Sequence, residues 1–211
     1  MYSRKYSIPI RCFRLFKFRL GGHSKGGNIA IYAGLMYENK NIVSLDCYDG
    51  PGFFNSFYDN IKNKDLLKKS NCYLPKDSIV GRILEHKENI IVVDSSGNGI
   101  WQHDIFTWYV DKYNIIKYDN LSSGSNAIYE TLKKMIDLTT ASQRKIFFDS
   151  IFSLIYSTGK DSFKEVSLLK SIPKLLSTYK NFDENDRKLV NKFIVEFVKT
   201  YIINYGKSLT K

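Results

Sequence analysis

The sequence predicts an α/β fold with a mostly parallel sheet, followed by an all-helical C-terminal region. Strand-like and helix-like segments alternate over residues 1–124, which is typical of strand–helix–strand units. A Gly-x-Ser-x-Gly pentapeptide at residues 22–26 lies where an expected strand passes into an expected helix. Beyond this part, apolar residues recur only at helical spacing. We therefore expect two domains, an α/β core over residues 1–124 and a helical region over residues 125–211.

The α/β core is expected to open with a strand over residues 13–20 and a helix over residues 27–38. Residues 41–48, with the sequence NIVSLDCY, form the next expected strand. The turn signal Asp-Gly-Pro-Gly follows at once and ends this strand. The remaining elements expected from the same patterns are a helix over 54–69, a strand over 71–74, a helix over 79–86 and a strand over 90–94.

The C-terminal region shows three helical patterns. Apolar residues at four-residue steps predict a helix over residues 128–136, and a second apolar pattern predicts one over residues 146–155. The third helix begins after Asp183, whose side chain can cap it. An apolar stripe runs along it from Leu189 to Ile202, and we expect this stripe to pack on a core of its own.

The pentapeptide predicts a nucleophile elbow, a sharp turn that exposes a serine oxygen at the edge of a sheet. Ser24 is its central residue, and the glycines beside it leave space where a Cβ would meet neighbouring backbone. The helix that follows offers free N–H groups, and that of Lys25 is the expected donor to an oxyanion. The chain is therefore expected to carry the nucleophile half of a serine hydrolase.

A serine nucleophile needs a histidine base, and the chain has three histidines. His23 lies beside Ser24, and we expect its side chain to point away from the serine. His86 lies at the end of an expected helix. His103 follows the fourth strand after a glycine-containing loop, where a catalytic histidine belongs. His103 is therefore the favoured base, and His86 is the alternative.

The histidine in turn needs an orienting carboxylate, and two aspartates compete for this role. Asp49 ends one expected strand and Asp77 follows the next, so both lie at the sheet edge that carries the serine. Each also has a structural explanation, since Asp49 can bond its own turn and Asp77 can cap the helix expected after it. Asp49 is favoured over Asp77, and Asp94 and Asp104 are weaker alternatives.

Four motifs in register resemble an uncharacterised bacterial family of lipase-like α/β-hydrolases, which is similar in turn to the class 3 lipases. These motifs are GGHSKGGN at residues 21–28, DGPGF at 49–53, SIVG at 78–81 with LEH at 84–86, and QHD at 102–104 with Phe106 and Trp108. The resemblance covers roughly residues 20–160. It implies a partial α/β-hydrolase fold in which Ser24 is the nucleophile and His103 the base.

The same resemblance does not decide the acid. Asp49 lies in a family motif, whereas the class 3 lipases place their acid near the position of Asp77. Members of the family have a longer segment before the elbow, so we expect the usual first strands to be missing from this chain.

The resulting hypothesis is a lipase- or esterase-type serine hydrolase that acts on carboxylic esters. Ser24 attacks the acyl carbonyl, His103 takes its proton, Asp49 or Asp77 orients the imidazole, and the N–H of Lys25 binds the oxyanion. The alternative is a non-catalytic or truncated hydrolase-fold protein that binds an anionic partner or a membrane surface.

Composition limits the partners. The net charge of +11 is compatible with peripheral contact with an anionic membrane, but the lysines are spread along the chain and no basic-aromatic nucleic-acid module occurs. Cys12, Cys47 and Cys72 are well separated, which favours free thiols in a reducing cytoplasm. No metal or cofactor is expected, because no Cys/His cluster occurs. No apolar run reaches about 18 residues, so no membrane-spanning helix is expected. The expected substrate is a small-molecule or lipid ester.

Overall fold

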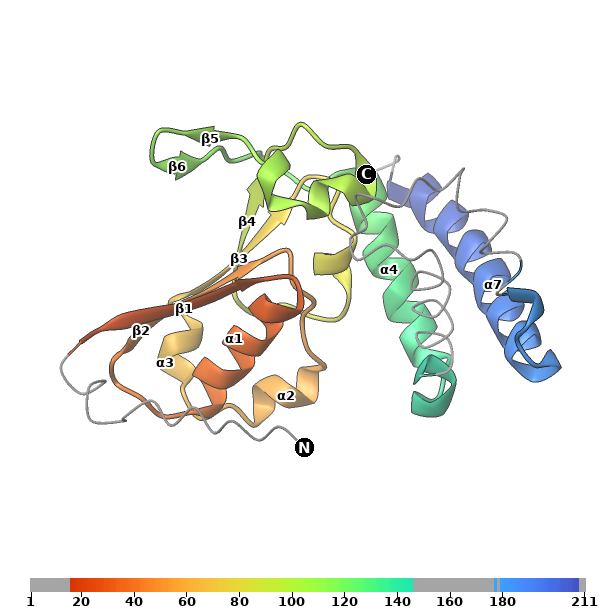
Figure 1. Cartoon of the computed structure of the whole chain (residues 1–211), viewed down its shortest axis with the longest axis horizontal. Coiled ribbons are helices and arrows are strands. Elements are labelled where there is room, and N and C mark those ends of the chain that lie inside the picture. Colours follow the sequence, from red (N-terminus) through yellow and green to blue (C-terminus); the bar gives the residue numbers. More distant parts are fainter. Residues whose placement is uncertain (1–15, 146–176, 178, 209–211) are drawn as a thin grey trace. The chain divides into compact units, whose positions relative to one another are not determined.

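The computed structural model describes residues 16–145, 177 and 179–208, and the chain divides into two compact units, Met1–Ser125 and Asn126–Lys211 (Figure 1). The first unit contains, in chain order, β1 (Phe18–His23), α1 (Lys25–Met36), β2 (Ile42–Tyr48), α2 (Asn55–Asp59), α3 (Lys64–Leu67), β3 (Ser70–Pro75), β4 (Asn89–Val93), β5 (Val110–Asp111) and β6 (Asn114–Ile115). Helix α4 (Ser123–Asp137) crosses from the first unit into the second, and α7 (Glu184–Ser208) follows.

Four parallel strands form the main sheet in the order β1-β2-β3-β4, so each strand pairs with the one that precedes it in the chain. Helix α1 packs on β1 and β2, and α3 packs on β2. Both helices lie on the same side of the sheet (Figure 1). Because all strands run in one direction, their carboxyl ends meet at a single edge, where the loops after β1, β2, β3 and β4 come together.

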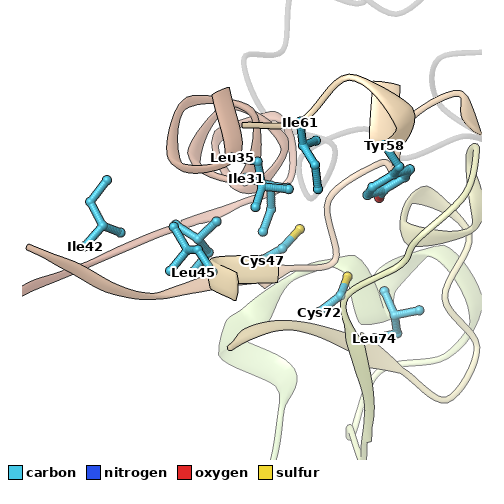
Figure 2. Close-up of a cluster of buried hydrophobic side chains, with 10 residues drawn as sticks. Ile31, Leu35, Ile42, Leu45, Cys47, Tyr58, Ile61, Cys72 and Leu74 are labelled. Atoms are coloured by element: carbon cyan, nitrogen blue, oxygen red, sulfur yellow. The ribbon is translucent and has the colours of Figure 1, made fainter. Parts of the chain in front are cut away.

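The core lies between α1 and the two middle strands. Ile31 and Leu35 of α1 face Leu45 of β2, and all three side chains are almost fully buried (Figure 2). Burial of each such side chain stabilises the fold by about 1.5–3 kcal/mol. The free thiols of Cys47 on β2 and Cys72 on β3 are neighbours in register and lie in the same core.

The mixed α/β class expected from the sequence is confirmed by this parallel sheet and its helices. The first strand differs from its expected range, because β1 continues through Gly21 and Gly22 to His23. Those glycines lack the apolar side chains that define the pattern, but their backbone pairs with Asp46 and Cys47 of β2. Main-chain pairing therefore extends the strand beyond the hydrophobic signal.

Two expected helices are wrong because tertiary hydrogen bonds take their backbone groups. The helix expected over 54–69 is split into α2 and α3, since the N–H groups of Lys62 and Asn63 both donate to the carbonyl of Leu35, at 3.0 and 3.1 Å. The Asn63 side chain then caps α3. The helix expected over 79–86 is only a 3-10 turn, η2 (Val80–Arg82).

The second unit contains the C-terminal helices. The expected helix over 128–136 is present as α4, and the last expected helix is α7, whose first turn is capped by Asp183. Val190 and Phe193 of α7 are buried, but Ile194 and Ile202 of the same stripe are exposed, so only part of it is covered. The helix expected over 146–155 lies outside the described residues. No helix in the described ranges is long and apolar enough to cross a membrane.

Candidate functional site

Ser24 lies on a strained bend between β1 and α1. Its φ is 55° and its ψ is −129°, a combination that residues with a side chain rarely adopt. The bend is fixed by main-chain bonds: the Ser24 N–H donates to the Tyr48 carbonyl at 2.9 Å, and its carbonyl accepts from Gly27 at 3.0 Å. The serine side chain does not cap α1. Its hydroxyl is therefore not used to form the turn.

Close backbone packing at this bend requires glycine at two positions. A Cβ on Gly22 would lie 2.4 Å from the carbonyl carbon of Gly26, and a Cβ on Gly27 would lie 2.6 Å from the Gly22 carbonyl oxygen. A Cβ on Gly26 would meet nothing within 4 Å. The essential pair is thus Gly22 and Gly27, rather than the two glycines of the pentapeptide.

Asp49 follows β2 and is completely buried, with a φ of 46°. Its Oδ1 accepts a hydrogen bond from the Ser78 hydroxyl at 2.6 Å and one from the Gly81 N–H at 3.1 Å. Its Oδ2 accepts from Nδ1 of His103 at 2.7 Å. This capture of the Gly81 N–H bends the chain into η2 and explains why the expected helix does not form.

His103 ends the 3-10 helix η3 (Gly99–His103), after β4. Because Nδ1 carries the proton donated to Asp49, Nε2 of the neutral ring has a free lone pair. Nε2 makes no hydrogen bond with any described residue, and about 20% of the side chain is exposed. The imidazole is thus held on one side and open on the other.

Asp77 does not contact the imidazole but holds the residue before it. The Asp77 N–H donates to Oε1 of Gln102 at 2.9 Å, and Nε2 of Gln102 donates back to Oδ2 of Asp77 at 2.9 Å. Trp108 adds a third bond by donating its ring N–H to the Gln102 carbonyl at 2.8 Å. These contacts fix the segment that presents His103.

His86 belongs to a different, buried cluster. Its Nδ1 lies 3.1 Å from Oε2 of Glu88, and the Tyr58 hydroxyl donates to both oxygens of the same carboxylate. The side chain of His23 contacts His103: Nε2 lies 2.7 Å from the His103 carbonyl oxygen. Sequence reasoning missed Gln102 and Ser78, although both lie in motifs that it had singled out.

The acid loop and the elbow abut each other. A Cβ on Gly50 would lie 2.4 Å from the Ser24 carbonyl oxygen, so Asp49 is next to a residue in close contact with the bend. Sγ of Cys47 lies between them, 2.7 Å from the Cβ position of Gly27 and of Gly50. Ser24, Asp49 and His103 therefore converge at one edge of the sheet.

The N-terminus of α1 completes the electrostatic environment. No side chain caps this helix and its first turn has no acidic residue. The bonds to the Ser24 carbonyl begin with the N–H groups of Gly27 and Asn28, so those of Lys25 and Gly26 precede the first intrahelical bonds. They can donate to a negative charge. No group of three or more candidate metal-ligating side chains occurs among the described residues.

Two stacked tyrosines lie on the strands that end at this edge. Tyr48 and Tyr73 have ring centroids 5.1 Å apart. Burial, followed by the charge of Asp46, raises the pKa of both phenols above the ordinary value of 10.0. Both hydroxyls therefore stay protonated near neutral pH and add no charge to the site.

Comparison with protein families identifies one match. The model of the family described as Mbeg1-like matches residues 11–153, which is more than half of the chain and includes Ser24, Asp49 and His103. Neither the curated proteins nor the solved structures contain a match to this chain.

This match corrects the sequence-based family and function. The resemblance to lipase-like α/β-hydrolases related to the class 3 lipases is wrong, because the matching family is Mbeg1-like and no lipase family matches. The hypothesis of a lipase- or esterase-type hydrolase of carboxylic esters is wrong for the same reason, as is its truncated hydrolase-fold alternative. Short motifs specify a local bend and a few contacts, and different functions are built on such frameworks.

Proposed function

The chain belongs to the Mbeg1-like family. We propose, from the geometry of its site, that the carboxyl edge of its main sheet is a general-base site that removes a proton from a bound small molecule. The observation that supports this proposal is the 2.7 Å contact between Nδ1 of His103 and Oδ2 of Asp49. Asp49 is fully buried and has donors on both oxygens, so it holds the imidazole in one tautomer and one orientation.

Each residue has a distinct part in this proposal. His103 accepts the proton at Nε2, and the carboxylate of Asp49 stabilises the imidazolium that results. The Ser24 hydroxyl donates a hydrogen bond to the substrate. The N–H of Lys25, at the start of α1, donates to the negative charge left on the substrate. Asp77 acts indirectly, by holding Gln102, the residue before His103.

Several sequence-based expectations remain proposals alongside this one. They are a partial α/β-hydrolase arrangement of the sheet, which the strand–bend–helix unit of β1 and α1 supports, a cytoplasmic location, peripheral contact with an anionic membrane and the lack of a nucleic-acid partner.

The proposal is tested with 5-nitrobenzisoxazole, a carbon acid that opens to a coloured phenolate when it loses one proton. We expect the protein to open this probe faster than free imidazole at the same concentration. His103→Gln is expected to lower the rate by about 10²–10⁴-fold, the usual contribution of a positioned base. Asp49→Asn is expected to lower it as well, because the amide no longer favours the imidazolium.

His86→Gln is the matched control, since it changes another histidine that lies beside a carboxylate. It is expected to leave the rate per folded molecule unchanged. Ser24→Ala should lower the rate far less than His103→Gln, because ring opening of this probe needs a base and no nucleophile, and only a hydrogen bond to the substrate is lost. Equal rates for the wild type and His103→Gln would refute the proposal.

A further inference from the structure

We infer that His23 is a positioning residue for His103, an inference that rests on the proposed general-base function. Nε2 of His23 lies 2.7 Å from the carbonyl oxygen of His103. Because a carbonyl can only accept, His23 donates its Nε2–H in this bond. The two rings also touch, with centroids 4.5 Å apart and planes inclined by 38°.

The donor is itself firmly placed. His23 is the last residue of β1 and pairs in register with Tyr48 at the end of β2. Its backbone therefore belongs to the sheet, whereas His103 lies on the loop after β4. The bond joins residues 80 positions apart and ties this loop to the strand that carries the elbow.

The other contacts of the loop leave a role for this bond. Asp77 and Trp108 hold the side chain and carbonyl of Gln102, one residue earlier. Among the described residues, His23 is the side chain that holds the carbonyl of His103 itself. Without it, the peptide group after His103 keeps the bond from the Asp104 N–H to the Trp101 carbonyl, at 3.3 Å, but the imidazole can move relative to Asp49.

The contacts also separate this role from that of a second base. Nε2 of His23 is occupied by the His103 carbonyl, and Nδ1 of His23 contacts no carboxylate among the described residues. His103, in contrast, has Asp49 on Nδ1 and an open Nε2. His23 therefore acts through His103 rather than on the substrate.

Two substitutions of His23 test the inference with the 5-nitrobenzisoxazole assay. His23→Phe keeps the ring but removes the donor, and we expect kcat to fall about tenfold with KM unchanged, since misplacement of a catalytic group by 1 Å can cost up to about 100-fold. His23→Gln supplies an amide N–H in place of the ring N–H and is expected to restore kcat to within about twofold of the wild type. His23→Asn, whose amide is too short to reach, replaces His23→Phe if the latter does not fold.

Two results in this assay would overturn the inference. A wild-type kcat for His23→Phe would show that the bond is dispensable. A kcat for His23→Gln as low as that for His23→Phe would show that the imidazole itself is needed, as for a second base.

A separate readout keeps the inference distinct from the proposed function. In ¹⁵N-edited NMR spectra, the Nδ1 proton of His103 is expected to be protected from exchange with water in the wild type and in His23→Gln, and to exchange rapidly in His23→Phe. If this pattern holds but the wild type does not open the probe, the general-base function fails and the positioning role stands. If the probe reacts but exchange is equal in all three proteins, the positioning role fails alone.

Discussion

Two histidine–carboxylate pairs lie in the first unit, and only one of them is open. In the pair of His86 and Glu88, the two side chains are 5% and 0% exposed. The Tyr58 hydroxyl covers the carboxylate, and Sγ of Cys72 lies 3.9 Å from Nε2 of His86. Both ring nitrogens therefore have neighbours in the core.

In the pair of His103 and Asp49 the carboxylate is equally buried, but the imidazole is 20% exposed and its Nε2 has no partner among the described residues. Under the proposed function, the same chemical groups serve stability in one pair and reactivity in the other, according to what surrounds the second nitrogen. A closed pair joins parts of the core, whereas an open pair beside a strained bend can exchange protons with a ligand.

The largest effect is expected from breaking the closed pair. Glu88→Ala leaves the Tyr58 hydroxyl and Nδ1 of His86 without their buried partner, and we expect the free energy of unfolding to fall by about 3–5 kcal/mol. Urea unfolding followed by the fluorescence of Trp101 and Trp108 measures this change.

The control for that substitution is Asp65→Ala, which removes an exposed ion pair with Lys68 and is expected to cost less than about 1 kcal/mol. Opening of 5-nitrobenzisoxazole per folded molecule should stay unchanged in Glu88→Ala. A loss of probe opening with little loss of stability would reverse the roles assigned to the two pairs.

The next effect concerns the bend beside the open pair. Gly22→Ala drives a Cβ into the backbone of Gly26 and Gly27, and we expect it to lower the free energy of unfolding by about 1–3 kcal/mol. In Gly26→Ala the added Cβ of this α1 residue contacts nothing within 4 Å, and we expect the free energy of unfolding to rise by about 0.5–1 kcal/mol. Thermal melting of the two variants side by side measures the difference, and similar destabilisation of both would contradict the packing described for the bend.

The buried cluster of Tyr58, Cys72, His86 and Glu88 also predicts that the free energy of unfolding falls at alkaline pH. Burial and the charge of Glu88 raise the pKa of Tyr58 far above its ordinary 10.0. The hydrogen bond to Cys47 and burial raise the pKa of the Cys72 thiol well above its ordinary 9.0. The folded protein thus holds both protons more tightly than the unfolded chain does. The stabilisation is complete below these ordinary values and is lost as the pH rises through and above them.

Each of the two groups contributes a slope of up to about 1.4 kcal/mol per pH unit in that range. Urea unfolding at pH values from 8 upward, at about half-unit steps, measures the slope. Tyr58→Phe is expected to flatten it, and a slope that is equally steep in this variant would assign the effect to other groups.

The smallest change in stability is expected from a residue with strained backbone that belongs to neither histidine–carboxylate pair. Lys112 has a φ of 34° in the exposed turn between β5 and β6, whereas the positive φ values of Ser24 and Asp49 belong to the open site. Lys112→Gly is expected to raise the free energy of unfolding by about 0.5 kcal/mol and to leave probe opening unchanged. A destabilised variant would show that this turn is not strained.

Features that depend on local sequence were predicted best. The apolar run of β2, the bend at Ser24 and the amphipathic pattern of α4 are written in adjacent residues. The split of the helix expected over 54–69 was not predictable, because it depends on the carbonyl of Leu35 accepting from Lys62 and Asn63. A distant acceptor leaves no mark on local periodicity.

The candidate site follows the same rule. Ser24 was proposed from the pentapeptide, and Asp49, Asp77 and His103 from their places after strands, but the sequence alone left two aspartates in competition. Asp49 contacts the imidazole and Asp77 contacts Gln102. Both contacts depend on how the loop after β4 folds. The family assignment failed because a few short motifs describe a local turn and not the chemistry of a whole protein.

The sulfur of Cys47 works as a spacer between the bend and the acid loop. It occupies the space that side chains on Gly27 and Gly50 would take, so we expect its size to influence the separation of Ser24 and Asp49. Serine at this position would keep that separation nearly unchanged, whereas valine would wedge the two loops apart and move the carboxylate away from the hydroxyl. We therefore expect the volume of the side chain at residue 47 to affect the distance between Ser24 and Asp49.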